Sequence, residues 1–147
     1  MATNPLVDQG VVNRLRASVV WASFPTLNVT PAYLGEDAIN MALEGDASTQ
    51  IPTMTGAVQS PEPYMAVAIT INLLRTQPLA DLYKKQMEKT ALLGDCTVRP
   101  DATPLSPYPF YNCSIQGVRE LNFGGRSAGW IVTCRGYYLV NSDLWNL

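Results

Sequence analysis

The stretch MAVAITINLL, residues 65–74, has the most regular pattern in the sequence. Large apolar side chains occupy every second position, and small or polar side chains lie between them. Because successive side chains of a β-strand point to opposite faces, this alternation predicts a strand with one face in a core. The small residues on the other face, Ala66, Ala68 and Thr70, predict close packing against another layer or another subunit.

Similar patterns predict strands on both sides of this stretch. They fall at about 13–21, 26–30, 38–43, 96–99, 110–121 and 130–141. The last of these carries apolar side chains on both faces, with Ile131, Thr133 and Tyr137 on the second face. We therefore expect this strand to be buried on both sides.

One helix is expected among the strands, over about residues 78–90. Pro78 suits a first helical turn, and Gly94 is placed to end the helix or the turn after it. Apolar side chains recur at helical spacing in Leu79, Leu82, Tyr83 and Met87, which predicts a helix covering an open sheet face. The expected fold class is mainly β, a β-sandwich or small barrel with one flanking α-helix. A chain of 147 residues fits a single domain over 1–147.

Charged residues make up only 15 % of the chain, against roughly 25 % in a typical soluble domain. This low share indicates that much of the surface is hidden in an assembly. The net charge of −2 provides no cationic surface for binding nucleic acid. The chain also has no histidine, so it lacks the commonest general base and zinc ligand. We therefore expect no enzyme, no cofactor and no metal.

The remaining chemical motifs are weak. Cys96, Cys113 and Cys134 are widely spaced in apolar contexts, which predicts buried thiols in a reducing cytoplasm. The Gly-rich segment 122–127 precedes a strand, so a hairpin turn is favoured over an anion site. Asp95 and Asp101 flank a short strand and are interpreted as turn residues. Neither a signal peptide nor a membrane-spanning run is expected.

Charge is unevenly distributed along the sequence. Between Ala17 and Leu74 there is no Lys or Arg, whereas five carboxylates give this span a local charge of −5. Two interpretations are open: the carboxylates solvate a loop, or, in a ring of identical subunits, they build an acidic surface or channel. They are Glu36, Asp37, Glu44, Asp46 and Glu62.

The order of parts resembles the tail tube proteins of bacteriophages, most nearly those of contractile-tailed phages. The tubes of phage-tail-like bacteriocins and of type VI secretion share that fold. The similarity covers roughly residues 33–141. It rests on the helix followed by LGDCTVRPD (93–101), YNCSI (111–115) and the closing strand GWIVTCRGY (129–137).

The resemblance implies a structural virion protein that forms hexameric rings. The rings would stack into a hollow tail tube, the conduit for DNA ejection into the host. The implied partners are further copies of the chain and the tail sheath, baseplate and tail terminator proteins. DNA would pass through the lumen without specific binding. The implied location is the phage tail in the virion, and the host cytoplasm during assembly.

Within this family, a long loop between early strands reaches the adjacent ring. The matching stretch here is about 44–63, and the five carboxylates become candidates for the lumen or for contacts between rings. We expect the ring sheet to use the strands at 65–74 and 130–141. Its candidate interface residues are Ala66, Ala68, Thr70, Ile131, Thr133 and Tyr137.

Two other interpretations stay open. The chain could be a different tail or baseplate ring component, or a secretion-system tube protein. It could also be an enzyme that works without histidine, through carboxylates such as Asp95 and Asp101. That enzyme would need the two carboxylates to meet in a deep pocket.

Overall fold

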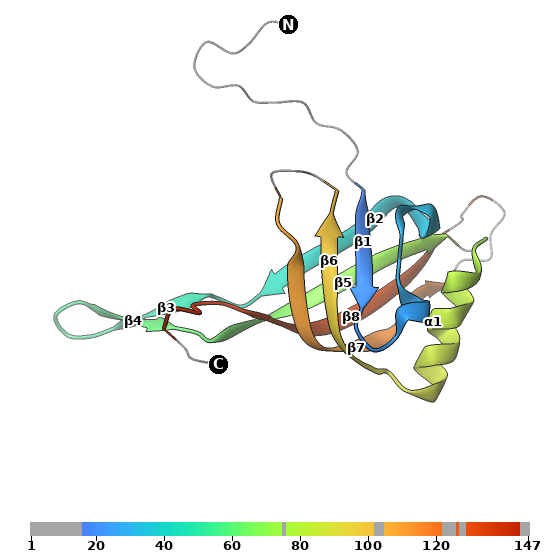
Figure 1. Cartoon of the computed structure of the whole chain (residues 1–147). Helices are drawn as coiled ribbons and strands as arrows, with labels where there is room; N and C mark the ends of the chain where they lie inside the picture. The colour runs from blue at the N-terminus through green and yellow to red at the C-terminus, as the bar shows by residue number, and fades with distance from the viewer. Residues whose placement is uncertain (1–15, 75, 102–104, 122–125, 127–128, 145–147) are drawn as a thin grey trace, which may run out of the picture.

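The computed structural model describes residues 16–74, 76–101, 105–121, 126 and 129–144 (Figure 1). Short 3-10 turns at Pro25–Leu27 and Pro31–Tyr33 follow the first strand. The strands and the helix are β1 (Ala17–Trp21), β2 (Leu34–Glu44), β3 (Ser48–Pro52), β4 (Ala57–Pro61), β5 (Tyr64–Leu74), α1 (Pro78–Lys89), β6 (Leu92–Pro100), β7 (Tyr108–Leu121) and β8 (Gly129–Leu139).

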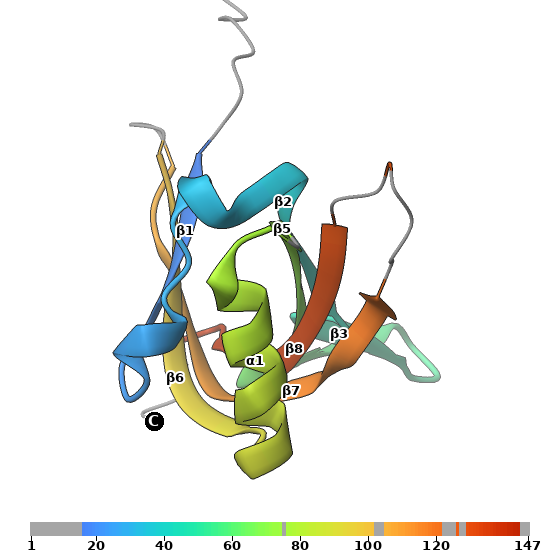
Figure 2. The same ribbon diagram turned by 90° about the vertical axis from the view of Figure 1, so that its right-hand side faces the viewer.

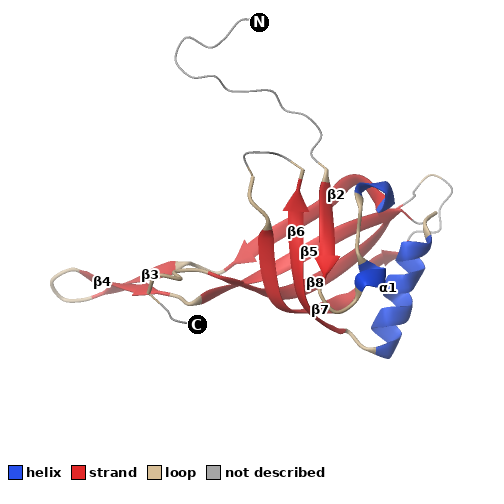
Figure 3. Ribbon diagram, viewed as in Figure 1, coloured by secondary structure: helices blue, strands red, loops and turns tan. Residues whose placement is uncertain are grey.

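Six of the strands form one antiparallel sheet in the order β1-β6-β7-β8-β5-β2. The sheet curls into a half-barrel, and α1 lies inside the curl against its concave face (Figure 2). Figure 3 shows how far strands dominate the molecule. The prediction of a mainly β, small-barrel fold with one helix is confirmed, and a single curled sheet forms it.

The concave face of the sheet holds the hydrophobic core. In β5 the predicted alternation is present, because Val67, Ile69, Ile71 and Leu73 are fully buried and the residues between them are not. No charged side chain of the described residues is buried. The three cysteines are buried as well, as predicted: Cys96, Cys113 and Cys134.

Helix α1 covers this core through one narrow face. Pro78 opens the helix as predicted, and Leu79, Ala80 and Tyr83 are the buried residues. Leu82, which the spacing placed on the same face, is instead 40 % exposed. The covering stripe is therefore narrower than the predicted one.

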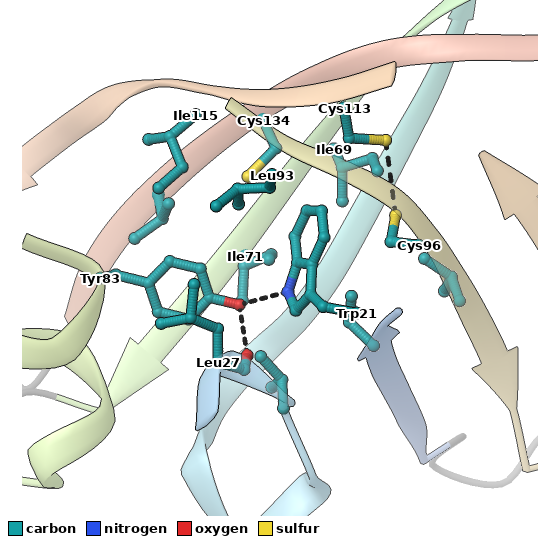
Figure 4. Close-up of a cluster of buried hydrophobic side chains, with 14 of the residues drawn as sticks. Trp21, Leu27, Ile69, Ile71, Tyr83, Leu93, Cys96, Cys113, Ile115 and Cys134 are labelled. Carbon is teal, nitrogen blue, oxygen red and sulfur yellow. Dashed lines mark hydrogen bonds between the residues drawn. The ribbon is translucent and has the colours of Figure 1, made fainter. Parts of the chain in front are cut away.

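Tyr83 ties the helix to the first strand and to the turn after it. The Trp21 Nε1–H donates a hydrogen bond to the Tyr83 hydroxyl at 2.9 Å, and that hydroxyl donates to the Leu27 carbonyl at 2.7 Å (Figure 4). Burial raises the pKa of Tyr83 far above its usual value, so the phenol stays protonated. Each polar atom of this buried group has a partner, which is the condition for placing it in a core.

Three local predictions need correction. Segment 44–63, expected as a long loop, contains the β3–β4 hairpin, which projects from the body as an arm (Figure 1). Segment 26–30 begins with a 3-10 turn, and only Val29 bridges to Val19. Gly94 does not end the helix, which stops at Lys89. It lies in β6 with a φ of 80°, at an irregularity in the pairing with β7.

The predicted turn at 122–127 and the residues before position 16 in the first predicted strand lie outside the described residues, apart from Arg126. Elsewhere, the observed strands extend or trim the predicted ones by a few residues. The largest extensions are in β2, which begins at Leu34 where a start near 38 was expected, and in β6, which begins at Leu92 where a start near 96 was expected.

Tyr83→Phe should lower the free energy of unfolding by about 1–3 kcal/mol, because the Trp21 indole N–H and the Leu27 carbonyl lose a buried partner. Urea denaturation measures this change. Tyr64→Phe serves as the control, since Tyr64 is exposed and a surface change of this kind costs roughly 0.5 kcal/mol or less. Equal losses in the two variants would show that the buried hydroxyl has no special role.

Gly136→Ala should destabilise the fold by about 1–3 kcal/mol through overpacking. An added Cβ would lie 2.6 Å from the Cys113 Sγ and 3.0 Å from the Tyr111 carbonyl oxygen. Gly129→Ala is the matched control in the same strand, because its Cβ would meet no atom within 4 Å. Thermal denaturation of both variants tests the difference, and equal melting temperatures would contradict it.

Candidate assembly surface

The face of the sheet opposite α1 is the first candidate surface. We call its part on β2, β5 and β8 the outer face. The strand register places Asn40, Thr70 and Thr133 in one row across the three strands, and Ala42, Ala68 and Arg135 in the next. The complete outer face contains Asn40, Ala42, Glu44, Ala66, Ala68, Thr70, Asn72, Ile131, Thr133, Arg135 and Tyr137.

All six residues predicted for a ring interface lie on this outer face. Ala66 is the register partner of Tyr137, Thr70 is the partner of Thr133, and Ile131 pairs with Asn72 beside them. Each is half-buried within the single chain. The sequence pattern therefore identified a contiguous surface, although β5 and β8 are interior strands of the sheet.

The outer face is almost uncharged. Among its described side chains, Glu44 and Arg135 are the only charged ones, and the Arg135 guanidinium forms an ion pair with the Glu44 carboxylate. The pair is partly exposed, so it adds little stability. It does cancel the one cation and the one anion of this surface. What remains is a flat array of small, neutral side chains.

Three tyrosines gather where the outer face approaches the arm. The Tyr137 ring lies 5.6 Å from the Tyr64 ring and 5.7 Å from the Tyr111 ring, between ring centres. With Pro63 and Leu139 they line a groove of about 750 Å³. We call it the tyrosine groove. Its lining is mostly apolar, so it suits an apolar segment better than a charged one.

The arm itself carries apolar side chains that have no cover. Ile51 and Val58 are direct register partners on β3 and β4, and they are 51 % and 54 % exposed. Met54, at the tip, is fully exposed. The base of the arm is fixed, because the Asn141 side-chain amide donates to the Ala47 carbonyl at 2.8 Å and to the Glu62 carbonyl at 2.7 Å.

The sheet also has two open edges next to the outer face. Strand β2 pairs only with β5. Strand β7 pairs with β6 from Tyr108 to Ser114, and its later residues, 116–121, pair only with β8 among the described residues. The section β7-β8-β5-β2 thus ends in an unpaired edge on each side. Sequence patterns do not reveal edges, because an edge is a property of strand order.

Of the five predicted carboxylates, the three that the structure describes do not form one group. Glu44 is paired with Arg135, Asp46 is exposed in the turn before β3, and Glu62 lies at the base of the arm. Glu36 and Asp37 belong to β2, and their side chains lie outside the described residues. A shared acidic role for the five would therefore require neighbouring subunits.

The described residues contain no cluster of three or more His, Cys, Asp or Glu that could hold a metal. Asp95 and Asp101 are separated by six positions along β6 and its end, a span of about 20 Å in an extended strand. The Asp95 carboxylate accepts a hydrogen bond from the Asn112 backbone N–H at 3.3 Å, which gives Asp95 a local structural role.

No helix in the described part of the chain is long and apolar enough to cross a membrane. Neither a scan against models of protein families nor a search of curated proteins finds a match for this chain. The function is therefore inferred from the outer face, the open edges and the arm.

Proposed function

We propose that this protein is a structural subunit that assembles into rings, and that the rings stack into a hollow tube of the bacteriophage tail type. The observation that carries the proposal is the β7-β8-β5-β2 section, which has an open edge on each side and, on β2, β5 and β8, an outer face whose described charges are one ion pair. Soluble proteins normally block such edges to prevent association. An assembling subunit uses them.

Ring closure follows from pairing unlike edges. If the β2 edge of one subunit bonds to the β7 edge of the next, every copy has the same contacts, and the contact repeats head to tail. A closed ring of this kind leaves neither of these two edges exposed. The family resemblance supplies the expected number of six subunits.

The outer face becomes one continuous wall in such a ring. Helix α1 fills the other side of each sheet, so the wall consists of the small, neutral side chains of β2, β5 and β8. DNA phosphates bind clusters of Lys and Arg. Among the described side chains of β2, β5 and β8, the one cation, Arg135, is already paired with Glu44, and the exposed Arg119 lies beside Gly117 on β7. A wall with so few free cations suits a conduit through which DNA slides.

The arm is suited to join successive rings. It extends beyond the body of the subunit, and Ile51, Val58 and Met54 gain from burial in a partner. The tyrosine groove offers an apolar lining at the end of the outer face. We assign the arm to contacts with a neighbouring ring, and the tyrosine groove, which lies beside the base of the arm, belongs to the same end of the subunit.

The direct test is electron microscopy of the purified chain over a concentration series, together with sedimentation velocity. Hollow tubes, or rings with six-fold symmetry, are expected. Single rings that never stack would favour a terminator or baseplate component. A chain that stays monomeric throughout the series would contradict the proposal.

Ile131→Asp should abolish assembly while the monomer remains folded. The change puts one uncompensated carboxylate per subunit onto the outer face, where copies repel one another. Ala68→Asp is a weaker test, since Ala68 is the register partner of Arg135 and the new carboxylate gains a cation there. Ser106→Asp, in the exposed segment before β7, is the control. Tubes formed by Ile131→Asp at wild-type yield would show that the outer faces of the copies do not line one shared, confined wall.

The double variant Ile51→Ser/Val58→Ser should prevent stacking and leave single rings, because the arm loses the apolar area that a neighbouring ring would bury. Gln50→Ser/Gln59→Ser is the matched control, since these residues form the adjacent register pair of the same hairpin. Microscopy with a count of rings and tubes measures the outcome. Equal tube lengths in the two variants would show that these arm side chains do not join rings.

A further inference from the structure

Two of the buried thiols lie in contact. Cys96 on β6 is 3 % exposed, Cys113 on β7 is 1 % exposed, and their Sγ atoms are 3.5 Å apart (Figure 4). Both are free thiols in this structure, as is Cys134 on β8. The two residues are separated by 17 positions in sequence, so the contact is made by the fold.

The backbone around this pair departs from regular pairing. The β6–β7 register shifts between Gly94 and Cys96, and the β7–β8 register shifts between Tyr111 and Ser114. Such bulges interrupt the ladder and let the strand bend locally. A disulfide requires the sulfurs to close to about 2.05 Å, a movement of roughly 1.5 Å from the present separation. The irregular backbone lies where this movement is needed.

We propose that Cys96 and Cys113 are a latent disulfide, which forms when the protein meets a low-molecular-weight disulfide such as oxidised glutathione, while Cys134 remains a thiol. The inference rests on the contact between the two sulfurs and applies to the single chain. It is independent of the proposed tube.

The chemistry assigns an order to the two thiols. The hydrogen bond between the two thiols, in which either sulfur can donate, lowers the pKa of Cys113 and raises the pKa of Cys96. Cys113 is thus the first nucleophile, since the thiolate is the reactive form. Burial raises the pKa of Cys134 to about 12, which disfavours its thiolate.

The reaction is a two-step thiol–disulfide exchange. The Cys113 thiolate attacks one sulfur of oxidised glutathione, forms a mixed disulfide and releases one glutathione thiolate. Cys96 then loses its proton and attacks the Cys113 sulfur, which releases the second glutathione. The two protein thiols are oxidised, one reagent disulfide is reduced, and the two protons end on glutathione.

The test exposes the purified chain to oxidised glutathione and counts free thiols after denaturation by mass tagging with a maleimide. One tag is expected after oxidation and three after reduction, and peptide mapping should identify the link as Cys96–Cys113. The reagent is also supplied during refolding from denaturant, so that burial does not limit access. Three tags in both experiments, retained glutathione or a link to Cys134 would overturn the proposal.

The melting temperature gives a second readout. Closing a loop of this length should raise it by roughly 5–10 °C when the link forms in the native geometry. Cys134→Ala should show the same rise, whereas Cys96→Ala should show none. A linked protein that melts at the same or a lower temperature than the reduced protein would show that the native fold does not accommodate the bond.

Discussion

The structure depends on covering the concave face of one curled sheet. That face is apolar along its whole length, and one helix of 12 residues must shield its centre. The helix does so through a narrow stripe that ends on Tyr83, whose hydroxyl is bonded to both Trp21 and Leu27. Because Trp21 belongs to β1 and Leu27 to the following turn, this one hydroxyl orients the helix, the edge strand and the turn together. Because α1 alone covers the centre of this core, the core depends on the hydrogen bonds of Tyr83 to hold the helix in place.

Helix α1 covers the concave face of the sheet. The opposite face is left in contact with solvent or with other molecules. The outer face has small, neutral side chains, and two strands end in open edges. The low charge of the sequence agrees with this arrangement, since a surface meant for water would carry more charge. The proposed ring and tube use each of these features once. The face forms a wall, the edges join copies, and the arm joins layers.

Much of the fold could be predicted from local patterns. The strand at 65–74 and the helix from Pro78 matched β5 and α1 closely, because alternation and helical spacing are strong signals in a half-buried element. The arm was missed, because both of its faces are exposed and its Ser, Thr, Gly and Pro content is typical of a loop. Gly94 was misread for a related reason: a glycine with positive φ serves a helix end and a strand bulge equally well. The open edges and the Cys96–Cys113 contact depend on strand order and register, which no single stretch encodes.

The position of the arm has a consequence for the shape of any stack. It leaves the body at one end of β2 and β5 only, and the turn between β5 and α1 lies at the other end (Figure 1). A stack held together by arms therefore has a direction, with arms free at one terminus and the β5–α1 ends of the subunits exposed at the other. The two termini of such a polymer differ in chemistry even though every subunit is identical. Each terminus can then bind a different capping protein. The direction in which one hairpin projects is sufficient to make the two termini different.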